Sequence, residues 1–94
     1  TASSCSNSTI IFKSYAGDGA TRSTNCDVYF YDGIDEICGI KSKNTRFYSP
    51  HKENLDKIKK VAGVSCSYFL LDDEDNAKPY GLKSKIFSFF GGKK

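Results

Sequence analysis

The sequence lacks several features that would each place it in a large class of proteins. It has no methionine, no close C-x-x-C cysteine pair, only one histidine, and no apolar run long enough to span a bilayer. A membrane-spanning helix needs about 20 apolar residues, so we do not expect one here. Structural zinc needs four Cys or His ligands, usually in close pairs, so we predict no zinc site and no other metal or cofactor.

The start of the chain indicates export. It begins Thr1-Ala2-Ser3-Ser4 without an initiator methionine, which is typical of a protein whose signal peptide has been removed. Asn7-Ser8-Thr9 matches the acceptor pattern for N-linked glycosylation, which makes Asn7 a candidate glycosylation site. We therefore predict a secreted, extracellular protein.

Cysteines are expected to compensate for a thin core. Ninety-four residues predict one secreted domain over residues 1–94, with residues 91–94 as a flexible tail. Two disulfides, each removing about 3–4 kcal/mol of unfolded-state entropy, would stabilise such a domain. Four free thiols are the alternative, and the pairing stays open because four cysteines allow three connectivities. The predicted disulfide cysteines are Cys5, Cys26, Cys38 and Cys66.

Strand signals dominate the sequence. β-branched and aromatic residues gather in short runs that end at glycine, aspartate or proline. One segment, residues 50–61, has apolar residues at three-residue spacing among lysines, which predicts a short helix. The predicted strands cover residues 9–15, 27–31, 45–48, 67–71 and 85–90.

The chain also contains an internal repeat. Residues 26–43 and 66–85 both begin with a cysteine and an aromatic-rich strand, pass through an acidic turn, and end in a Gly-apolar-Lys-Ser-Lys segment. The two copies start 40 residues apart. Each copy reads as strand, acidic hairpin, glycine and strand, so one supersecondary unit is used twice.

This order of elements resembles the βγ-crystallin Greek-key family, whose members pair an aromatic-rich first strand with a hairpin glycine. The segment Tyr29-Phe30-Tyr31-Asp32 and Gly39 carry the resemblance, which extends over about residues 26–90. It implies a mostly β fold in which two Greek-key-like units form a compact β-sandwich with one short helix and two disulfides. Because the second unit ends near Phe90, the strand at residues 9–15 is expected to complete it.

Metal binding and catalysis are not expected. The residues that match the calcium segment of crystallin-like domains are 55–60, where lysines would repel a cation. The acidic run 72–76 lacks the glycine that an EF-hand loop needs and is better explained as a solvated hairpin tip. His51, Glu53 and Arg46 together suggest ribonuclease chemistry, but a lone histidine at a helix start is better explained as a surface residue. We predict that the protein is not an enzyme.

A binding surface is predicted from the lysines. The net charge is only +3, but the basic residues concentrate between positions 41 and 85. If the two Gly-x-Lys-Ser-Lys segments lie near each other, they present one basic face to a host or target-cell protein, a cell-wall polymer or a membrane. So small a charge disfavours nucleic acid, and we expect a monomer. The predicted binding surface consists of Lys41, Lys43, Arg46, Lys83 and Lys85.

The resemblance also implies a function. Small secreted members of the family include killer toxins and effectors of plant-pathogenic fungi, so we predict a toxin-like or effector-like protein that binds a target on another cell or host. The alternative is a protease inhibitor that inserts an exposed rigid loop, either residues 33–38 or residues 72–79, into a protease cleft. A structural, calcium-stabilised crystallin is the third possibility, and the lysines at the metal positions argue against it.

Overall fold

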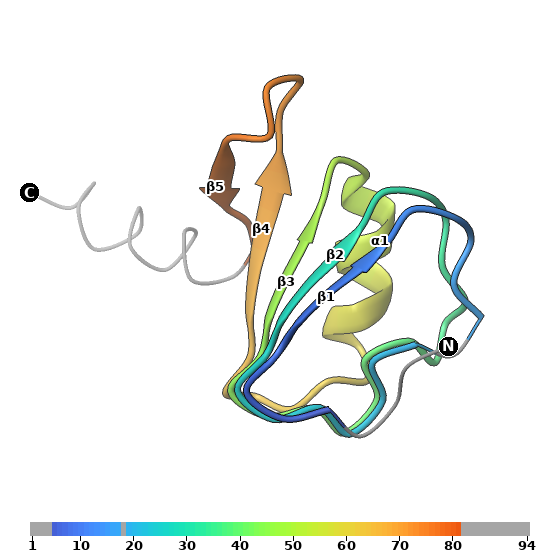
Figure 1. Ribbon diagram of the computed structural model, residues 1–94, viewed down its shortest axis with the longest axis vertical. Coiled ribbons are helices and arrows are strands. Elements are labelled where there is room, and N and C mark those ends of the chain that lie inside the picture. The colour runs from blue at the N-terminus through green and yellow to red at the C-terminus, as the bar shows by residue number, and fades with distance from the viewer. Residues whose placement is uncertain (1–4, 18, 82–94) are drawn as a thin grey trace, which may run out of the picture.

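The computed structural model describes residues 5–17 and 19–81 (Figure 1). Within these residues, five strands form one sheet in the order β1-β2-β3-β4-β5. The prediction of a mostly β protein with one short helix is confirmed. The elements are β1 (Thr9–Phe12), β2 (Asp27–Phe30), β3 (Arg46–Ser49), α1 (Lys52–Lys59), β4 (Ser67–Leu71) and β5 (Ala77–Pro79).

The first four strands are parallel and follow one another in sequence order. Register partners are offset by 18 residues from β1 to β2, by 19 from β2 to β3 and by 21 from β3 to β4. Parallel neighbours need a long crossover, so the chain completes one coil for each strand. Figure 1 shows the segments that enter β1, β2 and β3 running side by side. The arrangement is that of a short solenoid, in which each coil stacks on its neighbours.

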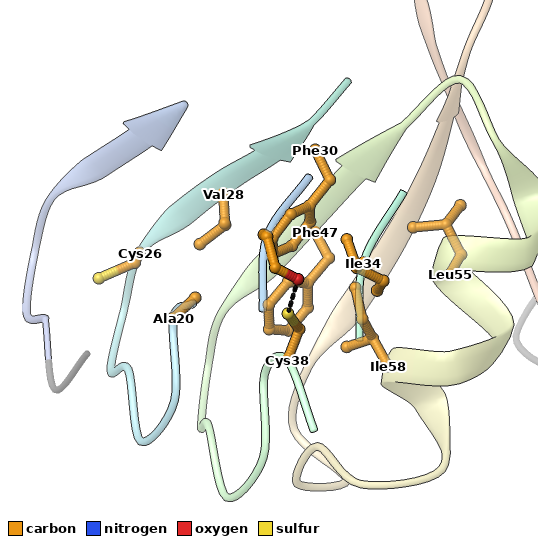
Figure 2. Packing of buried hydrophobic residues seen from close by; sticks show 10 residues of the cluster. Ala20, Cys26, Val28, Phe30, Ile34, Cys38, Phe47, Leu55 and Ile58 are labelled. Carbon is orange, nitrogen blue, oxygen red and sulfur yellow. Dashed lines mark hydrogen bonds between the residues drawn. The ribbon is translucent and has the colours of Figure 1, made fainter. Parts of the chain in front are cut away.

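The core lies between the sheet and the returning part of each coil. Val28, Phe30 and Phe47 point inward from β2 and β3 and are fully buried. Ile34 and Ile58 pack against them from the opposite side (Figure 2). The rings also form a ladder across the strands, with centroids 5.0 Å apart for Phe12 and Phe30 and 6.3 Å apart for Phe30 and Phe47. Each coil therefore contributes one or two rings to a continuous interior.

Helix α1 covers the inner face within the coil that joins β3 to β4. Its apolar edge, Leu55 and Ile58, is fully buried, as the three-residue spacing predicted. Asn54 is also buried, and its side-chain nitrogen donates to the Asp32 carbonyl at 2.7 Å and to the Ser49 hydroxyl at 3.0 Å. These bonds tie the helix to the end of β3 and to the preceding coil.

The corners of the coils depend on residues that accept unusual backbone angles. Asn7, Asn25 and Asn44 occupy equivalent corner positions with φ of 51°, 54° and 50°, a left-handed conformation that asparagine tolerates well. The Asn25 amide nitrogen donates to the Asn7 side-chain oxygen at 2.6 Å, so neighbouring corners are joined directly. At a later corner, a Cβ on Gly63 would lie 2.6 Å from the Ser42 carbonyl oxygen. Only glycine fits this contact between two coils.

The topology differs from the two Greek-key-like units of a sandwich that the sequence led us to expect. A Greek key needs antiparallel neighbours, whereas only β4 and β5 pair in that way here. The acidic segment after β2 is not a hairpin, because its Ile34 and Cys38 are buried inside the coil. β1 pairs with β2 and lies far along the sheet order from β4, so it does not complete a second unit. The two repeat strands, β2 and β4, are instead equivalent strands two coils apart.

The predicted disulfides do not appear in the described chain, where no two of the four cysteines lie at bonding distance. The thiols of Cys26, Cys38 and Cys66 instead donate to the carbonyls of Thr24, Ala16 and Ser42 at 3.2–3.3 Å. Cys26 and Cys38 are fully buried and are part of the core. The cysteines therefore stabilise this structure as small apolar side chains that also satisfy carbonyls between coils.

Candidate functional site

The outer face of the sheet carries a row of apolar and aromatic side chains at one level. Register places Ile11 of β1 beside Tyr29 of β2, Tyr29 beside Tyr48 of β3, Tyr48 beside Phe69 of β4, and Phe69 beside Pro79 of β5. We call these five residues the outward row. Ile11 is 54% exposed and Pro79 is exposed, while the three aromatic residues between them are partly exposed. A continuous apolar strip of this kind on a sheet face marks a candidate binding surface.

The rings in the outward row stack on one another. The ring centroids of Tyr29 and Tyr48 lie 4.3 Å apart with an interplanar angle of 7°, and those of Tyr48 and Phe69 lie 5.1 Å apart at 19°. These distances match the spacing of about 4.8 Å between neighbouring strands. Tyr48 is therefore covered on both of its faces by its neighbours. The row offers ring edges to a ligand, because the ring faces are already occupied.

A charged pair lies one level below the outward row. Arg46 forms an ion pair with Asp27, its register partner, through two hydrogen bonds, and the Tyr48 hydroxyl donates to Asp27 Oδ1 at 3.0 Å. The hydrogen bond from Arg46 lowers the pKa of Asp27. Burial and the neighbouring Asp27 carboxylate raise the pKa of Tyr48 to about 12. The carboxylate is thus ionised and the phenol neutral at physiological pH, which gives the row a fixed polar border.

The tip of the β4–β5 hairpin is held rigid by its own hydrogen bonds. The Asp72 carboxylate accepts from the backbone N–H groups of Glu74 and Asn76, both at 2.9 Å, and these bonds lower the pKa of Asp72. Burial and Asp75 raise the pKa of Tyr31, which stacks on Tyr29 at 6.3 Å. The acidic tip therefore lies near one end of the outward row. The prediction of a solvated tip for residues 72–76 agrees with their full exposure.

The predicted basic surface is only partly described. Lys41 and Lys43 are exposed on the coil between β2 and β3, whereas Arg46 is engaged with Asp27. Lys83 and Lys85 lie outside the described residues, as do the predicted strand at 85–90 and the predicted tail at 91–94. The single basic face therefore stays a prediction. Asn7, the candidate glycosylation site, is exposed at the first coil corner.

The residues considered for catalysis and for calcium are not gathered into a site. Arg46 begins β3 and His51 follows its end, so at about 3.3 Å per residue the two lie well apart along the strand. Residues 55–60 belong mainly to α1, with Leu55 and Ile58 in the core. Among residues 5–17 and 19–81, no three His, Cys, Asp or Glu side chains gather as a metal site would require. The same residues include no helix that is both long enough and apolar enough to cross a membrane.

No family model matches the chain, and comparisons with curated proteins and with solved structures gave no match. The crystallin resemblance therefore stays a prediction. The outward row was not predicted from the sequence, although a signal for it exists. Tyr29, Tyr48 and Phe69 recur at the spacing of the coils, as do the corner asparagines. Reading the sequence at a period near 20 residues would have placed these side chains on one face.

Proposed function

We propose that this chain is a non-enzymatic binding protein that recognises another protein through its outward row. The observation that carries the proposal is the stack of Tyr29, Tyr48 and Phe69 at the centre of a partly exposed sheet face. Aromatic residues and arginine are enriched at the centres of protein interfaces, where a few of them supply most of the binding energy. The Asp27–Arg46 pair beside the stack supplies the polar border that such interfaces have.

The geometry of the rings favours a protein partner over a carbohydrate. A sugar bound by stacking needs the open face of an aromatic ring, and both faces of Tyr48 are covered by its neighbours. The edges that remain form a ribbon about as wide as one side chain, bordered by hydrogen-bonding groups. Such a ribbon suits apolar side chains of a partner protein, which pack against ring edges without needing a flat platform.

The class of protein remains the one that the sequence suggested: a secreted toxin-like or effector-like protein whose target lies on another cell or host. The exposed acceptor asparagine, Asn7, is compatible with passage through a secretory pathway. The small size and the absence from the described residues of any gathered catalytic or metal-binding group both suit a binding module. The monomeric state is part of the same proposal.

A protease inhibitor is the second candidate, and the hairpin tip favours it. Residues 72–76 are exposed and are cross-linked by hydrogen bonds to the Asp72 carboxylate, so docking this loop would cost little conformational entropy. Residues 33–38, the other loop considered, are a poorer choice because Ile34 and Cys38 are buried. An inhibitory loop would therefore be the hairpin tip.

Selection from a displayed peptide library tests the protein-binding function. The immobilised wild-type chain is the bait, and selected clones are then measured against Tyr48→Ser and against Tyr15→Ser. Tyr15 is the matched control, because it is a 62% exposed tyrosine outside the sheet. We expect Tyr48→Ser to weaken binding by a factor of about 30 or more, the effect of losing a central interface residue. Tyr15→Ser should leave binding unchanged.

Two other outcomes would replace the proposal. Binding on a glycan array that is lost in Tyr48→Ser would assign the row to carbohydrate. Inhibition of any member of a protease panel that is lost in Asp72→Ala, but retained in Tyr48→Ser, would assign function to the hairpin tip. Clones that bind Tyr48→Ser as tightly as the wild type would show that the outward row is not the binding surface.

A further inference from the structure

A groove of about 650 Å³ lies at the β4 end of the coil stack, away from the outward row's tyrosines. It runs between the turn that leaves α1 and the edge formed by β4 and β5. Its walls are largely apolar, with Lys59 at one border. The residues that matter here are Ala62, Val64, Cys66, Tyr68 and Tyr80.

The groove exists because the stack ends there without a complete next coil. β3 pairs with β4 from Ser67 onward, whereas the β5 ladder reaches only as far as Phe69 on the other side. Val64, at the turn before β4, is fully exposed at 106%. Solenoids need a capping element at each end, since otherwise the apolar interior of the last coil faces water. The described residues leave this end of the interior open.

We propose that residues 82–90 of the same chain are the cap, with their apolar side chains filling this groove. The chain leaves the described structure at Gly81, directly after the groove residue Tyr80 and against Lys59, the border residue. The segment that follows reads Leu82-Lys83-Ser84-Lys85-Ile86-Phe87-Ser88-Phe89-Phe90, so it carries five apolar residues beside an apolar groove.

Tethering favours this occupant over any other. A segment joined to the groove wall by one residue has an effective concentration in the millimolar range, which a second copy or a separate partner rarely reaches. Thirteen residues follow Gly81, enough to cross the groove with the final Gly91-Gly92-Lys93-Lys94 left in solvent. The three aromatic residues in the segment would otherwise remain in water.

Val64 allows a sharp test because it is fully exposed among the described residues. A fully exposed valine adds little to the stability of the folded coils, so Val64→Asp should leave them intact. The substitution would, however, place a charge against any apolar segment that covers the groove. Ile37→Asp is the matched control, since Ile37 is also an exposed apolar residue, at 45%, and does not line the groove.

Hydrogen exchange of the full-length chain, followed by mass spectrometry, measures the docking. In the wild type we expect amides in residues 82–90 to exchange at least about tenfold more slowly than in an unstructured peptide of the same sequence. Val64→Asp should remove that protection, and Ile37→Asp should retain it. Phe87→Ser should also remove it and Phe87→Leu restore most of it, which tests the contact from the segment's side.

Exchange of residues 82–90 at the rate of the unstructured peptide in the wild type would overturn the proposal. Protection that appears only as protein concentration rises, together with dimers in sedimentation, would assign the groove to a second copy and overturn it as well. Protection that survives both Val64→Asp and Phe87→Ser would place the segment elsewhere. None of these outcomes depends on whether the outward row binds a protein.

Discussion

The two faces of the sheet are both rich in aromatic side chains, yet only one of them is covered. On the inner face, Phe30 and Phe47 are fully buried by the returning coils and by α1. On the outer face, Tyr29 and Tyr48 form an equally regular stack that remains partly exposed. Adjacent residues in one strand, Phe47 and Tyr48, therefore have similar size but different surroundings.

This difference separates the side chains that hold the fold from those available to a partner. The inner rings gain free energy from removing apolar area from water, so they are needed whether or not a partner is present. The outer rings pack only against each other, and their remaining surface is available for binding. A sheet with one buried face and one aromatic, exposed face is what a binding role requires, and the following changes test the contrast.

The largest expected difference is between alanine substitutions at positions 47 and 48. Phe47→Ala should destabilise the protein by about 3–5 kcal/mol, because it empties a fully buried site. Tyr48→Ala should cost about 1–2 kcal/mol, the loss of two cross-strand contacts. Denaturant unfolding of the two variants measures both values. Equal costs would mean that the outer face is covered as fully as the inner one.

A smaller effect is expected where the backbones of two coils meet behind the inner face. Gly63→Ala should destabilise by about 1–3 kcal/mol, because its Cβ would lie 2.6 Å from the Ser42 carbonyl oxygen. Gly17→Ala is the control, since a Cβ there meets no atom within 4 Å, and it should change stability by about 0.5 kcal/mol or less. Thermal unfolding of the two variants checks the prediction. A harmless Gly63→Ala would show that the coils can separate at this corner.

The smallest effect concerns one tyrosine on each face. The pKa is raised to about 12 for Tyr48 by burial and Asp27, and for Tyr68 by burial. Because folding favours the neutral phenols, their contribution to stability is complete below pH 10 and is lost as the pH rises through 12.

Ultraviolet-monitored titration of the tyrosines distinguishes the two faces. Asp27→Asn should move the pKa of Tyr48 towards its ordinary value of 10, because it removes a carboxylate that disfavours the phenolate. Tyr68 should not respond, since Asp27 does not contribute to its shift. Tyr68→Phe assigns the second titration step. A common shift of both tyrosines in Asp27→Asn would indicate a general loosening of the sheet instead.

Local structure was predictable from the sequence because it depends on local patterns. The strands at residues 9–12, 27–30, 46–49 and 67–71 lie almost entirely within the predicted segments, and the helix at 52–59 lies within residues 50–61. β5 was missed because Ala77-Lys78-Pro79 has little strand propensity. Proline is tolerated only because β5 is an edge strand.

Topology was not predictable from the same patterns. The acidic residues after β2 suggested a hairpin, and nothing local shows that Ile34 and Cys38 between them turn inward. Tyr29-Phe30-Tyr31 is aromatic at every position, so its alternation does not tell which face is buried. The 40-residue repeat was a real similarity between equivalent strands, but it spans two coils, and the shorter period between them is less regular.

The one-coil-per-strand arrangement makes the length of the outward row a countable property. Every coil contributes one strand, and every strand adds one side chain to the row at a step of about 4.8 Å. Inserting or deleting a coil of 18–21 residues would therefore lengthen or shorten the recognition strip by one rung while leaving the remaining rungs in place. Reach along a partner can thus change in whole units, without redesign of any existing contact.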